Sequence, residues 1–172
     1  MLKKLFCAAL LSGLAAFSVF AQSKAGNFLG TWKLTEIKGS MKNSTIDSMV
    51  LNISQTGDEI KIEKITQGVY LDKPYSLTRT ELYALNGSDS VSVVGGLTGG
   101  TQTNRMRLLA PDKLRFDSTL NQDRARTSIR EFWSVSDDGK TLTIETTGRT
   151  NFKNSSAVQG GTVSSKLVFT KQ

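Results

Sequence analysis

Hydrophobic and polar residues alternate along most of the chain after Phe28, in short segments that turn-forming residues separate. A period of two is typical of β-strands that bury one face, and no stretch keeps the period of an α-helix. The turn signals are dipeptides rich in glycine, proline, asparagine and aspartate: Thr56-Gly57, Asn86-Gly87, Pro111-Asp112, Asp138-Gly139 and Gly160-Gly161. The pattern predicts about ten short strands in one domain.

Four of these turns predict β-hairpins, and each hairpin specifies which residues stand opposite one another. The expected facing pairs are Ile53 with Ile60, Leu51 with Ile62, Leu82 with Val91, Thr80 with Val93, Leu109 with Leu114, Arg107 with Phe116, Val135 with Leu142, and Trp133 with Ile144. Every hairpin then has one apolar face and one mainly polar face. In the second hairpin Arg79, Glu81 and Tyr83 are expected on the outer face, with Arg79 and Glu81 as a solvent-exposed pair.

A sheet of about ten strands with one apolar face must cover that face, and closure into a barrel does so while removing the exposed edges. The first strand has Trp32 and Leu34 on one face, and the last strand has Val163, Leu167 and Phe169 on one face. In a closed barrel these two strands are neighbours. We therefore predict an all-β fold, a single antiparallel up-and-down β-barrel of about 8–10 strands.

The N-terminal segment is expected to lie outside this fold. Residues 1–21 begin with a positive charge, continue as an apolar run and end with Val19 and Ala21 at the spacing that a signal peptidase reads. The alternative, an uncleaved membrane anchor, fits less well because the run is shorter than the ~20 residues that a span requires. The sequence predicts a signal peptide over 1–21, a barrel domain over 22–172, and a periplasmic or secreted protein.

Composition narrows the chemistry that the folded domain can carry. The chain has no histidine, and Cys7 in the predicted signal peptide is its one cysteine. Histidine-ligated haem, Ser–His or Cys–His catalysis, disulfides and zinc sites built on these residues are excluded. The net charge of +7 falls to +5 without the two leader lysines, and it is spread along the chain. We expect no cofactor and no nucleic-acid partner.

The first and the last predicted strands have sequence patterns that are typical of a known family. Phe28-Leu29-Gly30-Thr31-Trp32-Lys33-Leu34 opens the barrel, and Lys166-Leu167-Val168-Phe169-Thr170-Lys171 closes it. With the hairpins between them, these segments resemble the calycin superfamily, which holds the lipocalins and the fatty-acid-binding proteins. The hairpin sequence Asp138-Gly139-Lys140-Thr141-Leu142-Thr143 adds a closer likeness to small secreted bacterial lipocalin-like proteins.

The resemblance implies that Trp32 packs across the closed end of the barrel, beside a cation that Lys166 or Lys171 supplies. It also implies a small hydrophobic or amphipathic ligand in the interior. Two features of fatty-acid-binding proteins are absent from the sequence. Residues 39–48 read as a loop in place of two helices, and Leu167-Val168-Phe169 stands where those proteins hold a fatty-acid carboxylate with Arg-x-Tyr.

The informative side chains are charges that the hairpins place on the apolar face. Arg105 and Arg107 fall on it, and Glu131 falls on it between two apolar residues. A buried charge needs a partner, so Arg107 could pair with Glu131 while Arg105 sits at the barrel mouth. Alternatively, both arginines meet an anionic or polar ligand group. The candidate ligand-binding residues are Arg105, Arg107, Phe116, Glu131 and Trp133, with no catalytic residue and no metal ligand assigned.

Three functions remain open for such a barrel, because a fold does not choose among them. The first is a non-catalytic barrel that binds or carries a small molecule. The second is a cofactor-free enzyme, and the third is a structural or protein-interaction module with a packed interior. A cavity favours the first two, and a cluster of arginine, glutamate and tyrosine inside the barrel would favour the enzyme. The oligomeric state is left open.

Chelators and reducing agents should leave the stability of the processed protein unchanged, because no histidine or cysteine remains to form a zinc site or a disulfide. Thermal unfolding with and without EDTA or dithiothreitol measures this. A midpoint that falls with EDTA would instead indicate a cation site built from carboxylates alone.

Overall fold

The computed structural model describes residues 25–39, 44–94, 100–152 and 162–172. These segments form one turn of 3₁₀-helix and ten strands. The bounds are η1 Gly26–Phe28, β1 Gly30–Lys38, β2 Ser44–Thr56, β3 Glu59–Tyr70, β4 Lys73–Ala84, β5 Asp89–Val94, β6 Gly100–Ala110, β7 Lys113–Gln122, β8 Ala125–Val135, β9 Thr141–Phe152 and β10 Thr162–Lys171. The predicted all-β fold is confirmed.

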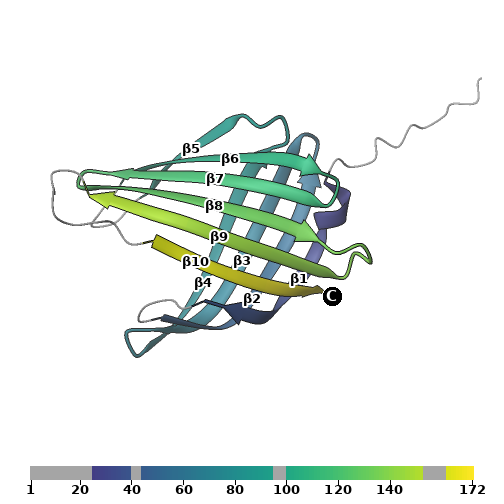
Figure 1. The fold of residues 1–172 in the computed structure, drawn as a ribbon, viewed down its shortest axis with the longest axis horizontal. Helices are drawn as coiled ribbons and strands as arrows, with labels where there is room; N and C mark the ends of the chain where they lie inside the picture. The colour runs from purple at the N-terminus through teal and green to yellow at the C-terminus, as the bar shows by residue number, and fades with distance from the viewer. Residues whose placement is uncertain (1–24, 40–43, 95–99, 153–161) are drawn as a thin grey trace, which may run out of the picture.

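All ten strands belong to one antiparallel sheet, in the order β4-β3-β2-β1-β10-β9-β8-β7-β6-β5. The first and last strands, β1 and β10, pair as predicted. The sheet curls until β4 lies close to β5 and β6, although the described residues of β4 and β5 form no hydrogen-bonded ladder. The result is a nearly closed up-and-down barrel (Figure 1).

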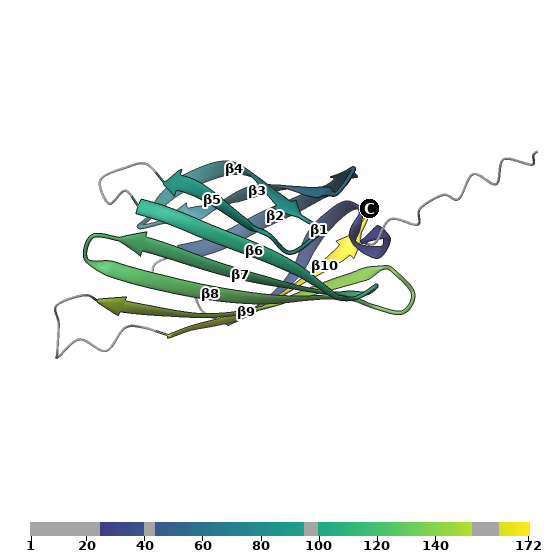
Figure 2. The same ribbon diagram turned by 90° about the horizontal axis from the view of Figure 1, so that it is seen from above.

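The barrel is narrow at one end and wide at the other. Figure 2 shows β4 and β5 diverging from β8 and β9 with increasing distance from η1. We call the end near η1 the closed end and the opposite one the open end. The buried apolar core gathers toward the closed end and consists mainly of Phe28, Trp32, Leu51, Ile53, Ile60, Ile62, Met106, Leu114, Phe116, Trp133, Val135, Leu142, Ile144 and Phe169.

Two of the four predicted hairpins bury the predicted faces. The pairs expected between β8 and β9 are confirmed, Val135 with Leu142 and Trp133 with Ile144. Between β2 and β3 the turn lies at Gly57-Asp58, so Ile53 stands opposite Ile62 and not opposite Ile60. This register differs from the prediction by two residues. Because side chains alternate with a period of two, the same side chains remain buried.

A β-bulge reverses the predicted faces of β6. The pairing with β7 skips Leu109, so Met106 and not Arg107 lies opposite Phe116. A bulge adds one residue to one strand, which exchanges the faces of every residue beyond it. Arg105 and Arg107 therefore project outward, and the prediction that they face the barrel interior is wrong.

The second predicted hairpin is also wrong, because β4 takes its register from β3 and not from β5. Ile60 lies opposite Tyr83, and Ile62 lies opposite Glu81. The two isoleucines are buried in the interior, and cross-strand partners share a face. Arg79, Glu81 and Tyr83 consequently point inward and not outward.

Other expectations fall partly or wholly outside the described residues. The predicted signal peptide over 1–21 and the Gly160-Gly161 turn lie outside them. The segment 39–48 is not a plain loop, because β2 already begins at Ser44. Within the described ranges, no helix has the length and apolar character that a membrane crossing needs.

Trp32 is completely buried at the closed end, and its indole N–H donates a hydrogen bond to the Phe28 carbonyl at 2.8 Å. The Lys171 ammonium lies 5.1 Å from the centre of the indole ring, a cation–π contact. Lys166 forms an ion pair elsewhere, so Lys171 is the cation of this end. Gly30 has a φ of 120°, which glycine adopts without strain as the chain passes from η1 into β1.

Replacing Trp32 by alanine should lower the free energy of unfolding by about 3–5 kcal/mol, because it opens a cavity in the closed-end core. Urea unfolding measures the change. Phe132→Ala is the control, since this ring lies on the outer face of β8 and is partly exposed, and it should cost less than about 1 kcal/mol. Equal losses in the two variants would contradict a core role for Trp32.

Candidate ligand-binding cavity

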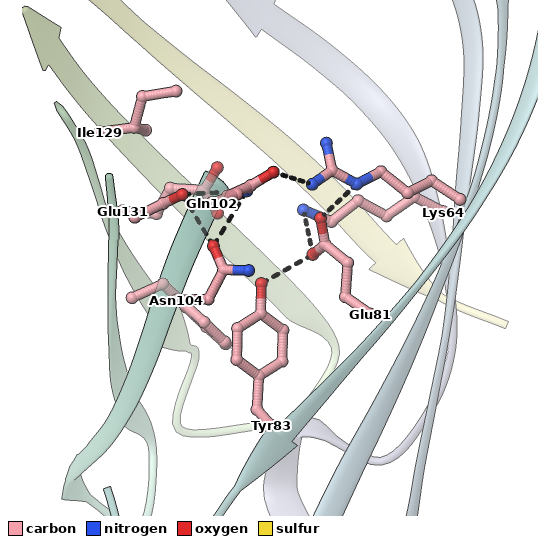
Figure 3. Close-up of a pocket in the computed structure, with 10 residues that line it drawn as sticks. Lys64, Glu81, Tyr83, Gln102, Asn104, Ile129 and Glu131 are labelled. Atoms are coloured by element: carbon pink, nitrogen blue, oxygen red, sulfur yellow. Dashed lines mark hydrogen bonds and ion pairs between the residues drawn. The ribbon is translucent and has the colours of Figure 1, made fainter. Parts of the chain in front are cut away.

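A cavity of about 110 Å³ lies inside the barrel (Figure 3). It is lined by side chains from β3, β4, β6, β7 and β8, namely Lys64, Arg79, Glu81, Tyr83, Gln102, Asn104, Phe116, Ser118, Ile129 and Glu131. Most of them are polar or charged. On each strand they follow a buried apolar residue in the direction of the open end, so the cavity rests on the closed-end core.

Strand alternation explains this polar layer. On β3 the inward positions Ile60 and Ile62 are followed by Lys64. On β4 the inward residues opposite these three are Tyr83, Glu81 and Arg79. Toward the open end the inward side chains thus become polar, after Ile62 on β3 and one step earlier, after Tyr83, on β4.

Glu81 is the centre of the polar cluster. Its carboxylate oxygens lie 3.1 Å from Lys64 Nζ and 2.8 Å from Arg79 Nε, and they accept a hydrogen bond from the Tyr83 hydroxyl at 2.8 Å. Burial would raise the pKa of Glu81, but the two cations and the hydrogen bonds outweigh burial, and the pKa is lowered. The pKa of Tyr83 is raised, first by burial and then by the charge of Glu81. The glutamate is therefore ionised and the phenol protonated at neutral pH.

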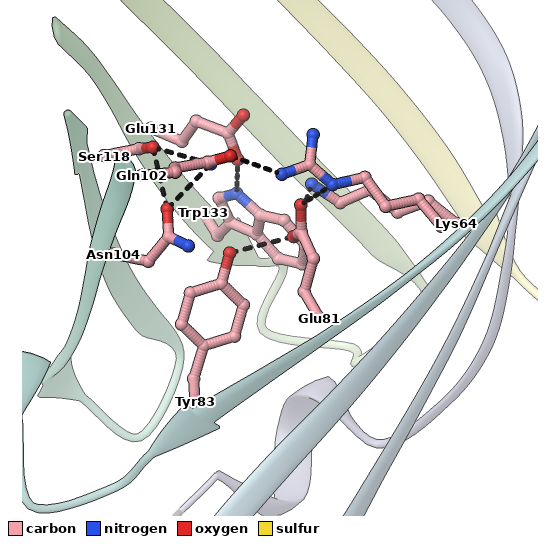
Figure 4. A network of polar contacts seen from close by, with 9 residues as sticks. Lys64, Glu81, Tyr83, Gln102, Asn104, Ser118, Glu131 and Trp133 are labelled. Carbon is pink, nitrogen blue, oxygen red and sulfur yellow. Dashed lines mark hydrogen bonds and ion pairs between the residues drawn. The ribbon is translucent and has the colours of Figure 1, made fainter. Parts of the chain in front are cut away.

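Arg79 connects β4 to β6 across the gap in the barrel. Its partner Gln102 lies beside Asn104 and Ser118 (Figure 4). Arg79 Nη2 donates a hydrogen bond to Gln102 Oε1 at 3.1 Å. Gln102 Nε2 donates to Asn104 Oδ1 at 2.9 Å and to Ser118 Oγ at 3.0 Å. The Ser118 hydroxyl also donates to Asn104 Oδ1, at 2.7 Å. Side chains thus bridge the two strands where the sheet provides no ladder between its edges.

Aromatic rings separate the cavity from the core. The Phe116 ring centroid lies 4.7 Å from that of Trp133 and 4.9 Å from that of Tyr83. The Trp133 indole N–H donates to Glu131 Oε2 at 2.8 Å, and Lys64 Nζ lies 5.7 Å from the Trp133 ring. The rings therefore pack against one another on the side of the core, and polar groups cover them on the side of the cavity.

The structure brings together three of the five predicted ligand-binding residues, Phe116, Glu131 and Trp133. Arg105 and Arg107 are not among them. Arg105 forms two hydrogen bonds to the Asp89 carboxylate on the outer surface, at 2.6 and 2.9 Å, and Arg107 is exposed. The predicted pairing of Arg107 with Glu131 is therefore wrong.

Sequence reasoning missed several groups that line the cavity. Lys64 carried a readable signal, because it continues the inward series of Ile60 and Ile62 at alternate positions. Asn104 carried none, because it reaches the interior only through the bulge in β6. Arg79 and Glu81 were recognised as a pair, but they were assigned to the outer face.

Beyond the cavity, apolar side chains on the inner wall of the open end are accessible to solvent, and hydroxyl side chains such as Thr66 and Thr150 stand between them. Among the inward-facing apolar residues there, Ile37, Leu77, Phe152 and Val163 are 36–55% exposed, while Leu120 is partly buried. Apolar residues inside a protein are normally covered. The described side chains therefore do not fill the open end of the barrel.

A scan against protein-family models and a search of curated proteins find no match for this chain. In the described ranges, no group of three or more histidine, cysteine, aspartate or glutamate residues is placed to hold a metal ion. The fold and the cavity are therefore the basis for a functional proposal.

The free energy of unfolding should depend on pH in a way that reflects the lowered pKa of Glu81. Because the folded pKa of Glu81 is lowered, its contribution to stability is complete above the ordinary value of 4.5 and is lost as the pH falls through the lowered value. Glu81→Gln should cost about 1–3 kcal/mol at neutral pH and should flatten the loss of stability on the acid side. Urea unfolding at a series of pH values measures both effects.

Glu145→Gln is the matched control for this experiment, because Glu145 is exposed on the outer face of β9 and pairs with Lys166. It removes the same charge and should change the stability by less than about 1 kcal/mol. A Glu81 variant with the stability and acid-side slope of the wild type would contradict the role of the cluster.

Proposed function

We propose that this protein binds or carries a small apolar or amphipathic molecule inside the barrel, without catalysing a reaction, in the periplasm or outside the cell. The observation that carries the proposal is the division of the barrel interior. A polar cavity lies against the closed-end core, and apolar side chains on the inner wall beyond it are accessible to solvent. A polar head group suits the first region and an apolar tail suits the second. The leader-like pattern of residues 1–21 supports the location.

The dimensions favour a ligand that occupies both regions. The cavity volume of about 110 Å³ is well below the roughly 300–1,000 Å³ of pockets that hold drug-sized molecules. A ligand would place its head group in the cavity and lay its tail along the open wall. Each Å² of apolar surface that the tail and the wall remove from water would contribute about 25 cal/mol.

We also propose that the protein belongs to the calycin superfamily. The nearly closed ten-stranded barrel supports this assignment, and so does the Gly30-x-Trp32 start of β1. The contact between Trp32 and Lys171 adds to it, because the resemblance implies this pair of side chains at the closed end.

A cofactor-free enzyme is the second candidate, and the interior cluster of Arg79, Glu81 and Tyr83 is the observation in its favour. General acid–base catalysis is most efficient when the pKa of the catalytic group lies near the working pH. The pKa of Glu81 is lowered and that of Tyr83 is raised, so both move away from neutrality. These directions favour a binding role for the cluster.

Binding of N-phenyl-1-naphthylamine, an uncharged apolar probe that fluoresces in apolar surroundings, tests the proposal. We expect saturable binding with a dissociation constant in the micromolar range. Ile129 lines the mouth of the cavity, so Ile129→Trp should fill it and weaken binding by at least about tenfold.

The matched control is Phe132→Trp, which adds the same indole to the outer face of the same strand, β8. It should leave the dissociation constant within about twofold of the wild-type value. Absence of saturable binding, or an equal loss in both variants, would contradict a binding site inside the barrel.

A further inference from the structure

In the hydrogen-bond network of the cavity, Arg79 determines which group of each neighbouring side chain donates and which accepts. A guanidinium group only donates, so the group of Gln102 that meets Arg79 must be its oxygen. This turns the Gln102 amide nitrogen toward Asn104 and Ser118. Asn104 must then accept with its own oxygen, which it does from both neighbours.

One hydrogen-bond donor is left over at the end of this chain of contacts. Asn104 is only 8% exposed, and Figure 4 shows its amide nitrogen directed into the cavity. No acceptor among the described residues bonds to that nitrogen. This nitrogen faces the cavity without a partner in the described chain, so it can donate to an acceptor of a molecule bound there.

One hydrogen-bond acceptor is left over on the opposite wall. Oε2 of Glu131 accepts a hydrogen bond from the Trp133 indole N–H. In the described part of the chain, no donor contacts Oε1 of Glu131. The nearby cations Lys64 and Arg79 are both engaged with Glu81. A carboxylate oxygen that faces a cavity in this way calls for an N–H or O–H donor.

The charges of the cavity exclude a strong preference for an anion. Four charged side chains line it, Lys64, Arg79, Glu81 and Glu131, and their formal charges cancel. A carboxylate head group would meet no uncommitted cation and would lie near Glu131. It could accept from Asn104, but it has no proton for Glu131. An ammonium head group could donate to Glu131, but it has no acceptor for Asn104.

We propose that the ligand enters with an uncharged head group that both donates and accepts hydrogen bonds, such as a primary amide or an alcohol. Asn104 donates to its oxygen, and Glu131 accepts from its N–H or O–H. Asn104 and Glu131 are then specificity-determining residues, while Arg79 and Gln102 are positioning residues. This inference rests on the proposed binding function and adds the chemistry of the head group to it.

Competition among molecules that share an octyl-length tail tests the head-group preference. Octanamide, octanoate and octylammonium would each displace N-phenyl-1-naphthylamine from the wild-type protein at neutral pH. Octanamide should compete at concentrations about tenfold lower than those of either charged molecule. Equal or tighter binding of octanoate or octylammonium would overturn the head-group inference and leave the binding function standing. Failure of all three molecules and of the probe to bind would overturn both.

Glu131→Gln supplies an independent measurement. The Trp133 indole would hold the new amide oxygen, and the amide nitrogen would then face the cavity as a donor. Octanoate should bind at least about tenfold more tightly to this variant, and octanamide should bind at least about threefold more weakly, because its N–H group loses the acceptor that Glu131 provides. Glu145→Gln makes the same change in net charge on the outer face and should alter neither affinity. A parallel gain in Glu145→Gln, or no gain in Glu131→Gln, would overturn the role of Glu131.

Discussion

The ionised carboxylate of Glu81 is the constraint on which the cavity depends. A charge inside a barrel persists only with partners, and Lys64, Arg79 and Tyr83 provide them from β3 and β4. Once Arg79 is held by Glu81, its remaining N–H groups point across the gap and reach Gln102 on β6. The ion pair that stabilises a buried glutamate therefore also links the edge strand β4 to β6 on the other side of the gap.

The interior is divided along the strands into a packed part and an open part. At the closed end the walls are near enough for large side chains to meet, and Trp32, Phe28 and Phe169 are completely buried there. Toward the open end the walls diverge, and side chains such as Leu77 and Val163 no longer reach a partner across the barrel. The packed core and the unfilled part of the interior are thus located in different layers of one sheet.

A single bulge decides the charge of the cavity. Without the extra residue at Leu109, β6 would direct Arg105 and Arg107 into the barrel, and the cavity would carry a surplus of positive charge. With the bulge, Asn104 and Gln102 face inward. Arg105 and Arg107 lie outside, where the solvent stabilises their charges. An insertion of one residue therefore changes the net charge of the side chains that line the interior.

The local features, the strands and most turns, could be predicted from the sequence alone. The pairing of the first and last strands followed from the need to close the barrel, and the lysine beside Trp32 followed from the family resemblance. Alternation and turn-forming dipeptides act over a few residues, so they can be read without a partner strand. Glu131 and Trp133 were assigned to the interior for the same reason, since the turn at Asp138-Gly139 specifies the register of its hairpin.

The faces that β4 and β6 turn inward depend on strand pairing in the folded barrel. The Asn86-Gly87 signal suggests a β4–β5 hairpin, yet β4 lies at the edge of the sheet and is aligned by β3 alone. The bulge at Leu109 leaves the alternation of apolar residues ambiguous, and only the pairing with β7 resolves it. Register is a property of two strands together, so the cavity's polar lining depends on contacts between segments far apart in the chain.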